Sequence, residues 1–98
     1  MTEDDIREAL HDVIDPELGV NIVDLGLVYD VAVVDGRSAR ITMTMTSPAC
    51  PLRDYLQDLV ESTVTARVLD AESVIVEIVT EPPWTEDLMS DAARRQLE

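Results

Sequence analysis

The sequence contains no lysine and no phenylalanine, and it has one cysteine and one histidine among 98 residues. One cysteine cannot form an internal disulfide bond, which fits a protein of a reducing compartment. No apolar run approaches the roughly 20 residues that span a bilayer. Residues 1–5 are acidic and lack the apolar segment of a secretory signal. We therefore expect a cytoplasmic location and no contact with a membrane.

Acidic residues greatly outnumber basic ones. The chain has 21 aspartates and glutamates against seven arginines, and its formal net charge is −14. Such a chain is repelled by nucleic acid and by anionic membrane surfaces, so we expect neither as a partner. Two interpretations of the lysine-free, acidic composition stay open: a GC-rich genome, in which arginine replaces lysine, or adaptation to a salt-rich cytoplasm, in which counterions screen the self-repulsion.

The length and apolar content together predict one folded domain. The hydrophobic fraction of 46% excludes a disordered acidic tail. A chain of 98 residues fits a single domain, residues 1–98, with a modest core.

Apolar residues near the N-terminus recur at helical spacing and predict a helix from about Thr2 to Ile14. Thr2 and Asp5 resemble a capping box, and Pro16 disfavours helical geometry at Asp15. The expected apolar face consists of Ile6, Leu10, Val13 and Ile14.

Residues 15–26 predict an ordered loop, because proline and glycine alternate there with apolar side chains that would anchor it to the core. Ordered loops often position functional groups. The expected anchors are Leu18, Val20, Ile22, Val23 and Leu25.

Two strands are expected next, over residues 27–34 and 39–46, with a turn at Asp35-Gly36. In the second strand Ile41, Met43 and Met45 alternate with threonines, which is typical of a half-buried strand. We interpret the methionine pair as core packing rather than as metal ligands.

A second helix is expected to begin at Cys50-Pro51, because proline is favoured at the first helical position. Residues 73–80 predict a third strand, and its apolar residues on both faces indicate a central strand. The second helix is expected to carry an apolar stripe, which consists of Leu52, Leu56, Leu59, Val60 and Val64.

Pro82-Pro83 should end the third strand, and Thr85 should cap a short C-terminal helix. The acidic residues of its first turn and the arginines of its last turn complement the helix dipole. The order of these elements along the chain is helix, hairpin, helix, strand and helix. This order predicts an α+β two-layer sandwich with a small mixed three-stranded sheet. In the expected C-terminal helix, the acidic residues of the first turn are Glu86 and Asp87, and the arginines of the last turn are Arg94 and Arg95.

Cys50 is expected at the cap position of the second helix, where free N–H groups and the helix dipole favour the thiolate that binds metal. Thr46 and Ser47 add hydroxyl groups nearby, so all three are candidate binding residues. The alternative is a buried structural cysteine. A thiol enzyme would need a base, and the single histidine, His11, lies off the apolar face and is expected in solvent. We therefore expect no enzymatic activity and no catalytic residue.

The loop 15–26 carries carboxylates that suit acid–base chemistry or hard-metal binding, namely Asp15, Glu17 and Asp24. For the two aspartates the more common use is local: Asp15 before proline fixes a turn, and Asp24 before a structured segment caps backbone N–H groups. Trp84 follows two prolines and either packs the tail onto the sheet or contacts a partner.

Three motifs resemble the signatures of the metal–sulfur cluster biosynthetic family, which includes SufT-like and PaaD-like domains and a cytosolic iron–sulfur assembly component of eukaryotes. The leading signature corresponds to residues 15–30, DPELGVNIVDLGLVYD. The second corresponds to residues 44–52, TMTSPACPL. The third corresponds to residues 81–84, EPPW, followed by Thr85 and by Met89-Ser90.

The resemblance implies a fold similar to the NifU-type cluster assembly domain and an accessory role in delivering iron–sulfur clusters to apoproteins. It assigns the family's cysteine to Cys50 and its acidic signature to Asp15, Glu17 and Asp24. The implied partners are other iron–sulfur assembly proteins and target apoproteins. One branch serves oxygenase maturation in phenylacetate degradation; its members carry a cysteine-rich C-terminal extension, and this sequence has no second cysteine.

One thiolate does not hold a cluster alone, because biological clusters usually take four protein ligands. Cys50 is therefore expected to share a transient iron–sulfur cluster with a second copy, a partner, a small thiol or local oxygen ligands. A symmetric homodimer is the simplest geometry. The alternative is an adaptor that recruits target apoproteins without binding a cluster.

Overall fold

The computed structural model describes residues 1–46 and 53–97. The predicted order of helix, hairpin, helix, strand and helix is confirmed, with one short 3-10 helix added near the C-terminus. In chain order the elements are α1 (Glu3–Leu10), β1 (Val28–Val34), β2 (Ser38–Met43), α2 (Arg53–Arg67), β3 (Ser73–Ile78), the 3-10 helix η1 (Glu86–Leu88) and α3 (Asp91–Leu97).

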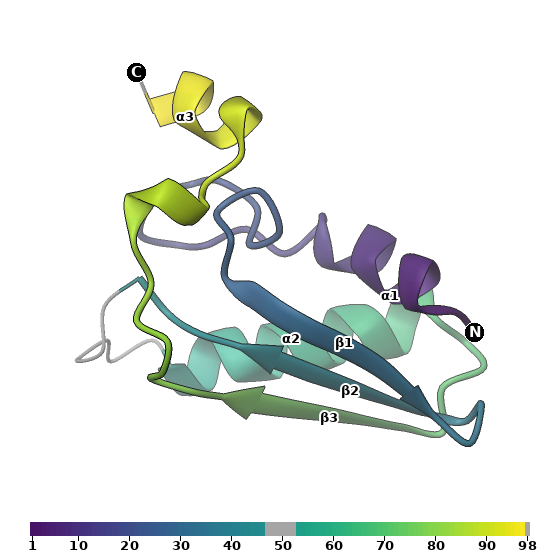
Figure 1. The fold of residues 1–98 in the computed structure, drawn as a ribbon. Helices are drawn as coiled ribbons and strands as arrows, with labels where there is room; N and C mark the ends of the chain where they lie inside the picture. The colour runs from purple at the N-terminus through teal and green to yellow at the C-terminus, as the bar shows by residue number, and fades with distance from the viewer. Residues whose placement is uncertain (47–52, 98) are drawn as a thin grey trace.

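The three strands form one mixed sheet in the order β1-β2-β3. β1 pairs antiparallel with β2 through the tight turn at Asp35-Gly36, and β2 pairs parallel with β3. A parallel pair needs a long crossover connection, which α2 supplies. α1 and α2 lie together on one face of the sheet (Figure 1). The predicted α+β two-layer architecture is confirmed.

The prediction that the third strand is central is wrong, because β2 is the central strand and β3 lies at the edge. Val76 of β3 is buried, whereas Ile75 is 44% exposed on the opposite face. The apolar residues on both faces of this strand therefore do not indicate burial on both faces.

The hydrophobic core lies between the sheet and the two helices, and it extends beneath the loop 15–26. Val20, Ile22 and Leu25 of this loop are buried, so the predicted anchoring is confirmed for them. Leu18 and Val23 are partly buried against the same cluster. The largest side chains of the core are Ile6, Leu10, Ile22, Leu25, Leu27, Ile41, Met43 and Leu56.

α1 begins as predicted but ends at Leu10 rather than Ile14. The Thr2 hydroxyl accepts from the Asp5 N–H, and the Asp5 carboxylate accepts from the Thr2 N–H, which confirms the capping box. Beyond Leu10 the backbone tightens, because the Val13 N–H donates to the Leu10 carbonyl three residues earlier. This shift breaks the helical periodicity, so Ile14 is 46% exposed and does not join the apolar face.

β2 ends at Met43, three residues before the predicted end. Met43 is fully buried in the core, as expected, while Met45 is partly buried. Thr44 is also buried, and its hydroxyl donates to the carbonyl of Val79 at 2.7 Å. The chain after β2 is thus tied to the chain after β3.

The described part of the second helix begins at Arg53. The predicted start at Cys50-Pro51 and the stripe residue Leu52 lie outside the described residues. The rest of the predicted stripe is confirmed, since Leu56, Val60 and Val64 are fully buried and Leu59 is partly buried.

The single C-terminal helix that was predicted is divided into η1 and α3. Thr85 precedes η1 but makes no capping hydrogen bond with its side chain. Met89 is extended and separates the two helices, and the Ser90 hydroxyl caps α3 by accepting from the Ala93 N–H at 3.2 Å. α3 stands away from the sheet (Figure 1). Within the described residues, no helix is both long enough and apolar enough to cross a membrane.

Candidate functional site

Asp15 fixes the start of the acidic loop 15–26. Its side chain is 2% exposed, and one carboxylate oxygen accepts from the N–H groups of Glu17 at 2.7 Å and Leu18 at 3.2 Å. The backbone of Asp15 also pairs with Gly19 and Val20. This carboxylate therefore has the local, turn-forming role that aspartate before proline commonly takes.

Replacing Asp15 by alanine is expected to destabilise the fold by about 1–3 kcal/mol, because two N–H groups would lose their acceptor. Asp15→Asn keeps one side-chain oxygen and is expected to cost less than half as much. Urea denaturation followed by circular dichroism measures both values. An Asp15→Ala variant as stable as the wild type would contradict this role.

Asp24 ends the same loop and is also engaged locally. Its carboxylate accepts from the side-chain amide of Asn21 at 2.7 Å, and its N–H donates to the Asn21 side chain at 2.9 Å. The Asp24 carbonyl accepts from the N–H of Ser90 at 2.7 Å. The loop is thus joined to the C-terminal segment as well as folded on itself.

Glu17 is the predicted acidic residue that approaches the cysteine motif. It is exposed, and its carboxylate accepts from the hydroxyl of Thr46 at 3.4 Å. Thr46 is the last described residue before the stretch that carries Cys50. Glu17 and Thr46 are 29 positions apart in the sequence, so the acidic motif and the cysteine motif meet at one end of the sheet.

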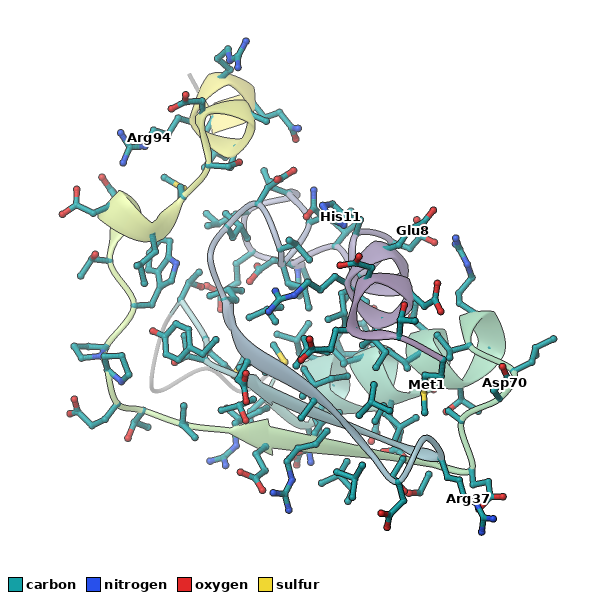
Figure 2. All side chains as sticks on the ribbon, turned by 45° about the vertical axis from the view of Figure 1, so that its right-hand side comes forward. Met1, Glu8, His11, Arg37, Asp70 and Arg94 are labelled. Atoms are coloured by element: carbon teal, nitrogen blue, oxygen red, sulfur yellow. The ribbon has the colours of Figure 1, made fainter. Side chains whose placement is uncertain are left out.

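Cys50 and Ser47 lie outside the described residues. Their roles remain predictions from the sequence. His11 is exposed at the end of α1, and its Nδ1–H donates to the carbonyl of Arg7 at 2.9 Å, as expected for a solvated histidine (Figure 2). Across residues 1–46 and 53–97, no group of three or more histidine, cysteine, aspartate or glutamate side chains is placed to hold a metal ion.

Trp84 fastens the C-terminal segment to the acidic loop. Its indole N–H donates to the carbonyl of Leu25 at 2.7 Å, and the ring packs against the core while remaining partly buried. The Tyr29 hydroxyl donates to the carbonyl of Pro82 at 2.7 Å. We call residues 79–90 the C-terminal strap; it follows β3 and runs past the end of the sheet (Figure 1).

Trp84→Phe is expected to destabilise the protein by about 1–2 kcal/mol, because a partly buried hydrogen bond is lost and the phenyl ring is smaller than the indole. Tyr29→Phe removes an exposed hydrogen bond of the same strap and serves as the matched control, with a smaller expected cost. Far-ultraviolet circular dichroism in urea measures both. Equal stability of Trp84→Phe and wild type would show that this bond does not hold the strap.

Two features of this region were not predicted from the sequence. Gly26 has a φ of +78°, and a Cβ atom added there would overlap the backbone of Leu88. A cavity of about 110 Å³ opens between the end of β2 and the strap. The sequence features that could have indicated the cavity are the alternating threonines before the cysteine and the motif EPPW. The residues that line the cavity are Thr44, Met45, Thr46, Val79, Thr80, Pro83 and Trp84.

Residues 3–78 match the family described as iron–sulfur cluster assembly protein. This chain belongs to that family. The match includes the acidic loop, the cysteine motif and all three strands, so the resemblance found in the sequence is confirmed.

Similar proteins cover nearly the whole chain. The Fe-S protein maturation auxiliary factor YitW of Bacillus subtilis is 46% identical over 97% of this chain and 92% of its own length. The Fe-S protein maturation auxiliary factor SufT of Staphylococcus aureus is 48% identical over 87% of this chain and 96% of its own. A crystal structure of a domain of unknown function from Bacillus anthracis has a TM-score of 0.94 and 42% identity, covering 97% of this chain and 90% of that one.

Proposed function

We propose that this protein is an accessory factor in the maturation of iron–sulfur proteins. In this proposal it works in the cytoplasm, receives a cluster as cargo and passes it to target apoproteins, without itself catalysing a reaction. The observation that carries the proposal is the contact between Glu17 and Thr46, which joins the acidic motif to the cysteine motif at one end of the sheet.

Cys50 is proposed as the protein's own ligand to the cargo, because a thiolate is the side chain that iron–sulfur clusters take. Thr46 and Ser47, close to Cys50 in the sequence, are proposed as further cargo-binding residues. Glu17 holds the Thr46 hydroxyl and places a carboxylate at the base of the cysteine motif. The contacts of Asp15 and Asp24 keep the acidic loop in this position.

Because Cys50 is the only cysteine, the other ligands are proposed to come from a second copy or from the target. Transfer then proceeds by ligand exchange: a thiolate of the target replaces the Cys50 thiolate on iron. A cluster held by few ligands from one chain dissociates more readily than one held by four, which suits a delivery role.

Native mass spectrometry of the anaerobically loaded protein tests this proposal. A cluster bound by two chains, or by one chain together with a small thiol, is expected. Absence of any cluster after loading with iron and sulfide or from a donor protein would contradict it. A cluster bound tightly by one chain without other ligands would contradict the sharing of ligands.

A further inference from the structure

The cavity at the end of the sheet lies between two segments that are tied together. One wall consists of Thr44, Met45 and Thr46, which follow β2. The Thr44 hydroxyl donates to the carbonyl of Val79 at the start of the strap, at 2.7 Å. This hydrogen bond ties the two walls of the cavity together, and one wall belongs to the cysteine motif.

The opposite wall is the strap itself, from which Val79, Thr80, Pro83 and Trp84 line the cavity. Trp84 is fixed there by its hydrogen bond to Leu25. Its indole N–H, like the Thr44 hydroxyl, thus already donates to a protein acceptor. The two walls therefore present mainly apolar surface to an incoming group.

The size of the cavity limits the group that fits. At about 110 Å³ it is smaller than the cavity of about 150 Å³ that accommodates benzene in another protein. A nucleotide or a coenzyme is too large for it. A branched aliphatic side chain matches both its volume and its lining.

The surroundings of the cavity are acidic. The carboxylate of Glu17 lies against Thr46, and the exposed Glu81 stands in sequence between the lining residues Thr80 and Pro83. The whole chain carries a net charge of −14. Basic groups flanking an apolar side chain would therefore be attracted to this surface.

We propose that this cavity is a docking site for a leucine-like side chain within a basic segment of a target apoprotein. The inference rests on the proposed function, because it brings the target to the residues that precede Cys50. Docking by a small apolar anchor with charged flanks gives orientation and fast association with limited affinity, which suits a transient encounter.

Fluorescence of Trp84 tests the proposal directly, because it is the only tryptophan and lines the cavity. The probe is a capped peptide with a central leucine flanked by two arginines on each side. We expect a saturable change in emission that weakens as salt is added. Peptides with alanine in place of leucine, or glutamates in place of the arginines, should bind at least tenfold more weakly. Equal binding of the leucine and alanine peptides would overturn the proposal.

Thr80→Phe is designed to fill the cavity from an exposed position, and Thr65→Phe is the matched control on the exposed face of α2. Only Thr80→Phe should lose binding, by at least tenfold, while both variants keep the wild-type circular dichroism spectrum. Unchanged peptide binding by a folded Thr80→Phe variant would overturn the proposal. A change of emission with protein concentration, but not with peptide, would show that a second copy occupies the cavity and would also overturn it.

Cys50→Ser separates this inference from the proposed function. The variant should bind the peptide with wild-type affinity and lose cluster transfer. Peptide binding by a wild-type chain that never carries a cluster would refute the proposed function and leave the docking site standing. Cluster transfer without peptide binding would refute the docking site alone.

Discussion

Replacing Cys50 by serine is expected to lower the rate of cluster transfer to an apoprotein by at least tenfold. Serine offers a hydroxyl that stays protonated at neutral pH, whereas a cysteine thiolate binds iron directly. A tenfold loss corresponds to about 1.4 kcal/mol in the free energy of the transition state. The measurement is the anaerobic gain of the visible spectrum of a target protein, with the loaded chain as donor.

A second variant tests whether the position of the thiol matters. Ser62 is exposed on α2, so Ser62→Cys combined with Cys50→Ser restores one cysteine at a different site. We expect this double variant to transfer as poorly as Cys50→Ser alone. If Cys50→Ser transfers at the wild-type rate, Cys50 is not the ligand through which the chain delivers its cluster.

Gly26→Ala is expected to destabilise the protein by about 3 kcal/mol or more, through strain and overpacking together. Gly26 has a φ of +78°, which disfavours any residue with a Cβ atom, and the added atom would overlap the Leu88 backbone. The backbone of η1 would have to move away from the acidic loop. Urea denaturation measures the loss, and the hydrogen bond between Trp84 and Leu25 should weaken with it.

Gly19→Ala is the matched control for this effect. Gly19 has a similar φ of +71°, but an added Cβ atom would meet nothing within 4 Å. Only the backbone strain remains, at about 1 kcal/mol. If the two variants lose the same stability, the close approach of Gly26 to Leu88 contributes nothing.

Much of the fold could be predicted from the sequence because its cues are local. The capping box of Thr2 and Asp5, the turn at Asp35-Gly36 and the stripe of α2 each follow from spacing of a few residues. Long-range pairing leaves no such local pattern. The edge position of β3 depends on which strand lies beside β2, and an exposed isoleucine at position 75 gave the opposite indication.

The candidate site was predicted in composition but not in geometry. The motifs identified Asp15, Glu17, Asp24 and Trp84, and the sequence favoured local roles for Asp15 and Asp24, but it did not indicate that Glu17 contacts Thr46. The hydrogen bond between Trp84 and Leu25 spans 59 residues, which no periodicity reports. The close approach of Gly26 to Leu88 is likewise a consequence of the assembled fold.

The most direct test of the proposed function is the activity of iron–sulfur enzymes in cells that lack this protein. We expect these activities to fall while the enzyme polypeptides remain present, since their clusters would not be delivered. The wild-type gene should restore the activities, and a Cys50→Ser gene expressed at the same level should not. Unchanged enzyme activities in the deletion strain, or full rescue by Cys50→Ser, would contradict a role as a carrier that delivers clusters through Cys50.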